Sequence, residues 1–112
     1  MGVLRSRPDE VQFWCGEEPM GETVMQTPLG YAKRFRDIAE AGQFQIHTNG
    51  ATVVVLKLRG ARRENVRRLV EERWNIPPAK QMLVHLGRQL MHGLLEDQGM
   101  TPGARVLVTK RI

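Results

Sequence analysis

A β-hairpin pattern near the middle of the chain constrains the fold most strongly. Residues 44–48 alternate apolar and polar side chains, which is typical of a half-buried strand. Asn49-Gly50 follows, and this dipeptide favours a tight hairpin turn because both residues tolerate positive φ. Residues 52–58 are a second stretch, rich in β-branched side chains, and Gly60 ends it. The sequence therefore predicts two antiparallel strands here.

One helical pattern follows the predicted hairpin. Within residues 63–75, Val66, Leu69 and Val70 recur at helical spacing and form an apolar stripe. Ile76-Pro77-Pro78 should end the helix, because a proline disfavours helical geometry in the residue before it. We expect one amphipathic helix, with its apolar stripe against a sheet.

The remaining strand signals lie after this helix. Residues 82–86 are a short apolar run, Leu90 begins a brief return, and residues 105–109 alternate after a turn at Pro102-Gly103. A single helix between a hairpin and later strands can pack across one face of a mixed sheet, with the last strand beside the first. This order predicts an α+β fold of the β-grasp type.

The first 26 residues carry no sustained periodic pattern. Glycine and proline interrupt them, as is typical of a loop or a disordered arm. Phe13 and Trp14 are the only bulky apolar pair in this stretch. The pair could pack onto the folded domain, form a short binding motif, or belong to a disordered segment.

A second helical pattern covers residues 28–41. Gly42 suits the position just after the end of that helix. We therefore expect residues 1–42 to form an N-terminal extension, largely disordered apart from this helix, and residues 43–112 to form the folded domain. The apolar residues that recur at spacings of three and four are Tyr31, Phe35, Ile38 and Ala39.

Residues between Glu64 and Gly93 carry a spacing known from one protein family. They are Glu64-Asn65-Val66, Ile76-Pro77-Pro78, Gln81, Leu83, Gly87, Gln89-Leu90 and Gly93. On these residues the chain resembles ubiquitin, without a gap, and Asn49-Gly50 stands where ubiquitin has its first turn. The resemblance covers residues 44–112. It implies a ubiquitin-like β-grasp roll, in which one main helix packs across a mixed sheet.

The end of the chain departs from the ubiquitin pattern. It stops at Lys110-Arg111-Ile112, without the diglycine of a conjugated modifier, and Arg88 stands where ubiquitin has its main chain-building lysine. The resemblance thus implies an integral domain of an adaptor or shuttle protein in the ubiquitin–proteasome or chaperone system, in the cytoplasm or nucleus. The basic residues 105–111 are similar to those of some BAG-type co-chaperones. A covalent modifier that lacks its diglycine is an alternative.

The resemblance also implies a shallow apolar patch on the sheet, opposite the helix. Periodicity agrees, because Val106 and Val108 should face the helix and leave the alternate residues of that strand to solvent. The expected partners of a monomeric domain are proteins with ubiquitin-binding motifs or proteasomal receptors, and the flanking basic residues favour acidic ones. The expected site residues are Val84, His85, Gly87, Arg88, Leu107 and Thr109.

Charge supplies a different hypothesis. Residues 43–112 hold twelve Lys/Arg and five Asp/Glu, within a chain of net charge +5. Such a balance favours acidic partners, nucleic acid among them. Against this, Phe44 and Trp74 are the only aromatic residues of the domain, so no stacking platform for bases is evident. The cluster that motivates the hypothesis is Arg62, Arg63, Arg67 and Arg68.

Nothing in the sequence indicates catalysis. There is no glycine-rich phosphate loop and no recognisable Ser–His–Asp arrangement, so we expect no enzyme activity. His47, His85 and His92 fall on different predicted elements without carboxylates or thiolates at ligand spacing, so we expect no metal and no cofactor. Cys15 is the single cysteine and reads as an incidental thiol. No apolar run reaches about 18 residues, so we expect no membrane span.

Overall fold

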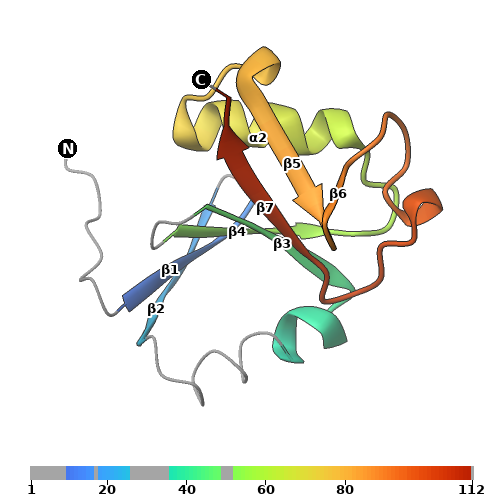
Figure 1. The fold of residues 1–112 in the computed structure, drawn as a ribbon. Helices are drawn as coiled ribbons and strands as arrows, with labels where there is room; N and C mark the ends of the chain where they lie inside the picture. The colour runs from blue at the N-terminus through green and yellow to red at the C-terminus, as the bar shows by residue number, and fades with distance from the viewer. Residues whose placement is uncertain (1–9, 17, 26–35, 49–51, 112) are drawn as a thin grey trace.

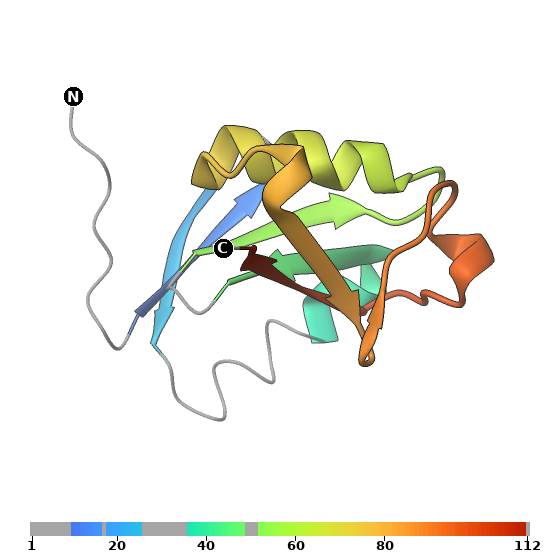
Figure 2. The ribbon, with the colours of Figure 1, turned by 45° about the horizontal axis from the view of Figure 1, so that its top comes forward.

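One main helix lies across a seven-stranded mixed sheet (Figures 1 and 2). The computed structural model describes residues 10–16, 18–25, 36–48 and 52–111. The strands follow the order β2-β1-β4-β3-β7-β5-β6. The expected α+β class and the single main helix are confirmed.

The elements have the following bounds. The strands are β1 Glu10–Cys15, β2 Glu18–Met25, β3 Gln43–His47, β4 Thr52–Lys57, β5 Gln81–His85, β6 Arg88–Gln89 and β7 Arg105–Lys110. The main helix is α2 Arg63–Trp74, and two 3-10 turns are η1 Pro78–Lys80 and η2 Glu96–Gln98. A further helical turn covers residues 36–40.

The central strands have the predicted pairing. β3 and β4 are antiparallel, as expected for the hairpin, although Asn49-Gly50 itself lies outside the described residues. β7 is parallel to β3, with Ile46 opposite Val106, so the last strand lies beside the first strand of the hairpin. β5 joins the other side of β7 in antiparallel fashion.

The main core fills the space between α2 and the sheet. The stripe of Val66, Leu69 and Val70 is buried, as predicted. The helix ends one residue before the predicted limit, because Asn75 adopts a left-handed conformation with φ of 56° and its N–H is bonded to Glu71 O. The strand residues that meet the helix include Phe44, Ile46, Val54, Leu83, Val106 and Val108.

Two N-terminal strands correct the expectation of a loop within residues 10–25, while residues 1–9 lie outside the described part. β1 pairs in parallel with β4 and antiparallel with β2. The N-terminal hairpin of β1 and β2 therefore extends the sheet beyond β4. The alternation in β1 explains this. Val11 and Phe13 are buried on the face away from α2, while Trp14 packs against the main core. Of the three alternatives for Phe13 and Trp14, packing onto the domain is therefore the correct one.

The added hairpin also changes the sheet as a whole. The sheet has seven strands, and its order differs from that of ubiquitin because β1 and β2 lie beyond β4. A second core lies on the face away from α2. Its members are Val11, Phe13, Ile38, Val53 and Val55.

The helix predicted over residues 28–41 is described only at its end. Residues 36–40 are helical, Ala41 N–H donates to Asp37 O at 3.0 Å, and Gly42 follows with φ of 71°, as predicted for the residue after the helix. Residues 26–35 lie outside the described part. Ile38 joins the second core, so this turn covers part of the sheet face that α2 leaves open. None of the described helices is long and apolar enough to cross a membrane.

Candidate functional site

Strand register aligns three residues on the sheet face opposite α2. Val84 on β5 is the partner of Leu107 on β7, and Leu107 is the partner of His47 on β3. Val84 and Leu107 are half-buried, whereas Val106 and Val108 are buried on the helix side. The predicted alternation of β7 is thus confirmed. An apolar pair lies on the open face, with a histidine beside it.

A hollow of about 630 Å³ surrounds this aligned group. It lies between the β5–β6 turn and the loop that precedes β7. Four of the six predicted site residues line it: Val84, His85, Gly87 and Leu107. We call it the sheet hollow. Because its centre is apolar and its shape is shallow, it can accept a side chain or a helix face from another protein.

Two predicted site residues lie outside the sheet hollow. Thr109 is the partner of Met82, two residues further along β7 from Leu107. Arg88 is exposed on β6 opposite His85, and it lines a neighbouring groove together with Met91. The six residues are therefore neighbours on one side of the molecule, but they do not form one cluster.

The turn between β5 and β6 places an apolar side chain at the rim. Leu86 and Gly87 both have positive φ, of 50° and 79°, as a tight hairpin turn of this kind requires. Leucine rarely adopts this conformation, and the side chain of Leu86 is 87% exposed. Such a combination is typical of positions held for binding. Leu86 was not among the predicted site residues, although the short connection before Gly87 was a usable signal.

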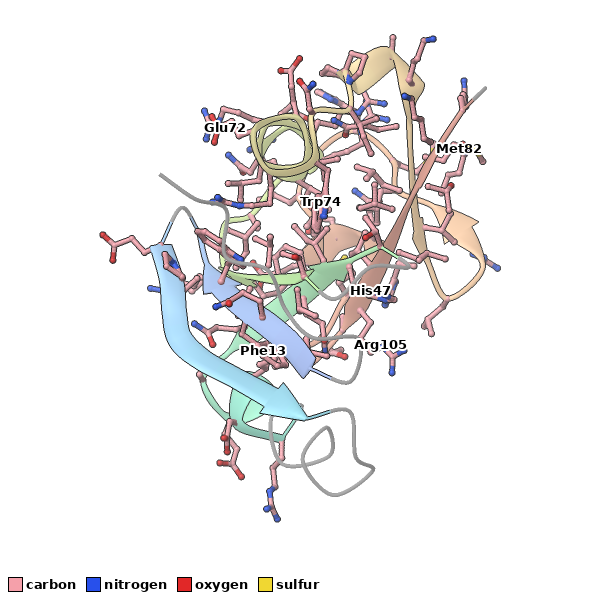
Figure 3. The ribbon with its side chains drawn as sticks, turned by 90° about the vertical axis from the view of Figure 1, so that its left-hand side faces the viewer. Phe13, His47, Glu72, Trp74, Met82 and Arg105 are labelled. Atoms are coloured by element: carbon pink, nitrogen blue, oxygen red, sulfur yellow. The ribbon has the colours of Figure 1, made fainter. Side chains whose placement is uncertain are left out.

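His47 and Arg105 are the other contributions that the sequence analysis missed. Both line the sheet hollow, and Figure 3 shows them away from the helix that carries Glu72 and Trp74. Burial lowers the pKa of His47, the charge of Arg105 lowers it further, and a backbone hydrogen bond at Thr48 opposes both effects.

Among the described residues that line the sheet hollow, Arg105 carries a positive charge at the rim and none is acidic. A partner with carboxylates beside an apolar anchor would complement this surface.

The arginines proposed for nucleic acid do not form one patch. Arg62 and Arg68 are exposed, whereas Arg63 and Arg67 are half-buried and line a different cavity. Phe44 is fully buried in the main core, so it offers no ring to a base.

The remaining polar groups do not assemble into a recognisable metal site within the described residues. Within the described part of the chain, no three His, Cys, Asp or Glu side chains gather closely enough to hold a metal ion. His92 Nδ1 lies 3.0 Å from Glu64 Oε1, and both side chains are exposed. The thiol of Cys15 is exposed, 3.8 Å from Gln43 Nε2. Comparison with protein-family models finds no match, and comparison with curated proteins finds no significantly similar sequence.

Proposed function

We propose that this chain is a non-catalytic protein-interaction module of the ubiquitin-like β-grasp type. Two features support the type: α2 crosses one face of the sheet, and β7 lies parallel to β3 in its middle. In this proposal β1 and β2 are an addition at the β4 edge. The remaining strands then follow the order β4-β3-β7-β5-β6, with the last strand beside the first.

The observation that carries the function is the pairing of Val84 with Leu107 on the open sheet face. Both side chains are partly exposed, and the described residues of the lining include Arg105 and two histidines but no carboxylate. An amphipathic helix with apolar anchors and acidic flanks, as in ubiquitin-binding motifs, suits this surface. The contact would be small, so its dissociation constant should be on the order of micromolar.

The cellular role follows from the resemblance to ubiquitin. A domain of this type serves an adaptor or shuttle of the ubiquitin–proteasome or chaperone system, in the cytoplasm or nucleus. Its partners would be ubiquitin-binding motifs or proteasomal receptors.

The test is an NMR titration of the isotope-labelled chain with a ubiquitin-interacting helix peptide. Shifts should concentrate at Val84, Gly87 and Leu107. Val84→Ala and Leu107→Ala should each weaken binding by about tenfold, the effect expected for a central apolar contact. Ile76→Ala is the matched control, because Ile76 is a half-buried aliphatic residue that packs against the main core. The affinity of the Ile76→Ala variant for the helix peptide should equal that of the unaltered chain.

Two results would count against this function. Unchanged binding in both alanine variants, with folding verified by thermal unfolding, would remove the sheet hollow from the interaction. A parallel titration with a short DNA duplex at matched salt tests the alternative. Shifts around Arg62 and Arg68 with DNA, and none with the peptide, would assign a nucleic-acid function instead.

A further inference from the structure

Three arginines converge on a small cavity on the helix side of the sheet. Arg63 and Arg67 come from α2, and Arg111 follows β7. The backbone N–H of Arg111 donates to Lys80 O at 2.7 Å, which fixes this end of the chain beside the start of β5. The cavity measures about 50 Å³, and β5 contributes Gln81 and Met82, the latter labelled in Figure 3. We call it the arginine pocket.

Gln81 gives the arginine pocket a fixed acceptor. Its side chain is only 5% exposed. The amide Nε2 donates to Arg67 O and to Ile76 O, each at 2.9 Å, so the orientation of the amide is set. The other end of the amide, Oε1, is buried and has no hydrogen-bond partner among the described residues. A buried amide oxygen without a donor is costly, and this one has almost no accessible surface, so a ligand with a donor would satisfy it after a small shift of the surrounding side chains.

The arginines of the pocket also carry buried polar groups without hydrogen-bond partners, and these groups are donors. The Nε atoms of Arg63 and Arg67 are buried and have no hydrogen-bond partner within the described part of the chain. Arg63 Nη1 has only a long contact, 3.4 Å, with Leu90 O. The two residues are four positions apart on one helix face, so their permanent charges repel each other.

No acidic group among the described residues balances these charges. The described residues that line the arginine pocket include no aspartate or glutamate. Among the described residues, no carboxylate lies within ion-pair distance of the three arginines. Partly buried cations without a counter-charge are unfavourable, and a bound anion would offset this.

We propose that the arginine pocket binds one tetrahedral oxyanion, a phosphate or phosphomonoester group. Guanidinium groups pair with phosphate oxygens through two parallel hydrogen bonds. The cavity is small, about 50 Å³, which suits a single anionic group. Inorganic phosphate, and a phosphomonoester in its singly charged form, carry a proton that can be donated to Gln81 Oε1, which an ionised carboxylate or sulfate cannot do. This site is separate from the sheet hollow and does not depend on the function proposed for it.

The first test compares anions on the unaltered chain. Inorganic phosphate is titrated at constant ionic strength, and the NMR signals of the Gln81 side-chain amide and of the Arg63 and Arg67 Nε–H groups are followed. These signals should shift and saturate. Sulfate is the matched control, since it has the same shape and charge but no proton to donate at neutral pH, and it should bind more weakly. Methyl phosphate distinguishes a group carried on a larger molecule from a free ion: if it binds as well as phosphate, the site takes monoesters, and if it does not, the site takes the free ion.

Variants then locate the binding. Arg63→Gln and Arg67→Gln should each weaken phosphate binding by about tenfold, the usual effect of losing a charged hydrogen bond. Arg68→Gln removes the same charge from an exposed position of the same helix, outside the arginine pocket, and should change the affinity less than about twofold. Val84→Ala should not affect phosphate binding, so a failure here is distinguishable from a failure of the proposed function. Equal weakening by Arg68→Gln, equal binding of sulfate, or shifts that rise linearly without saturation would overturn the proposal.

Discussion

The guanidinium carbon of Arg73 lies 4.0 Å from the centre of the Trp14 ring. Arg73 Nη2 also donates to Gly16 O at 3.0 Å. Trp14 belongs to β1, and Arg73 to the last turn of α2. The N-terminal hairpin is therefore attached to the main helix as well as to β4. These contacts make it part of the folded unit and not an appendage.

A double-mutant cycle should detect this attachment. Trp14→Leu and Arg73→Met should each lower the free energy of unfolding, and their coupling energy should be about 0.5–2 kcal/mol, the range for a cation over an indole ring. Urea denaturation measures the effect. Arg68→Met combined with Trp14→Leu is the control cycle, since Arg68 is exposed, and its coupling should be near zero. A coupling in the main cycle no larger than that of the control would contradict the role of this contact.

The second core supplies an independent prediction. Phe13 is fully buried beside Val53 and Val55, so Phe13→Ala should reduce the free energy of unfolding by about 3–5 kcal/mol. Cys15→Ala changes an exposed residue of the same strand and should have little effect. Unfolding is followed by urea denaturation. A small loss for Phe13→Ala would show that β1 does not share the cooperative transition of the domain.

The N-terminal strands show where sequence reasoning failed. Patterns local to the chain were sufficient for α2, for the β3–β4 hairpin and for the faces of β7, because helical or strand periodicity expresses them directly. The strand pattern of β1 is short and stands among glycines and prolines. Besides β2, which follows it in the chain, its partner is the distant β4, and parallel pairing leaves no turn signal between β1 and β4.

The candidate site likewise contains residues that local patterns predict and residues that only the pairing of distant strands brings in. The outward positions of Val84 and Leu107 followed from alternation within their own strands. His47 joined them only through the register between β3 and β7, which no local pattern specifies. The resemblance and the alternation of β7 both implied Thr109, but strand register places it beside Met82, and the tight turn carries Arg88, expected only as a flanking residue, to the edge.

Because the turn between β5 and β6 is strained at Leu86, relieving the strain should raise the stability of the domain and weaken its binding of the helix peptide. Leu86→Asn should raise the free energy of unfolding by about 1 kcal/mol, because asparagine tolerates a φ of 50° better than leucine does. The same variant should weaken binding of the helix peptide, since Leu86 lines the sheet hollow. Thermal unfolding and the peptide titration measure the two effects. Gly87→Ala is the opposite control and should destabilise, because Gly87 has a φ of 79°. If Leu86→Asn leaves both properties unchanged, Leu86 has no special role.

His47 predicts how stability depends on pH. Its pKa in the folded chain lies below the ordinary value of 6.5, so between these two values the unfolded chain binds more protons than the folded one. The contribution to stability is therefore complete above pH 6.5 and is lost as the pH falls through the folded pKa. Urea denaturation at a series of pH values should show the free energy of unfolding falling in this window. His47→Gln should flatten that part of the profile, and an unchanged profile in this variant would assign the effect to other groups.

The same histidine links pH to partner binding. Arg105→Gln removes one cause of the lowered pKa, so the ring titration of His47, followed by NMR, should move to higher pH. An acidic helix peptide bound in the sheet hollow should move it in the same direction, because a nearby carboxylate favours the charged imidazole. By linkage, the peptide must then bind more tightly as the pH falls through the pKa of His47. A peptide that leaves the His47 titration unchanged while binding at Val84 and Leu107 would show that its carboxylates lie elsewhere, and that charge does not select the partner at this end of the sheet hollow.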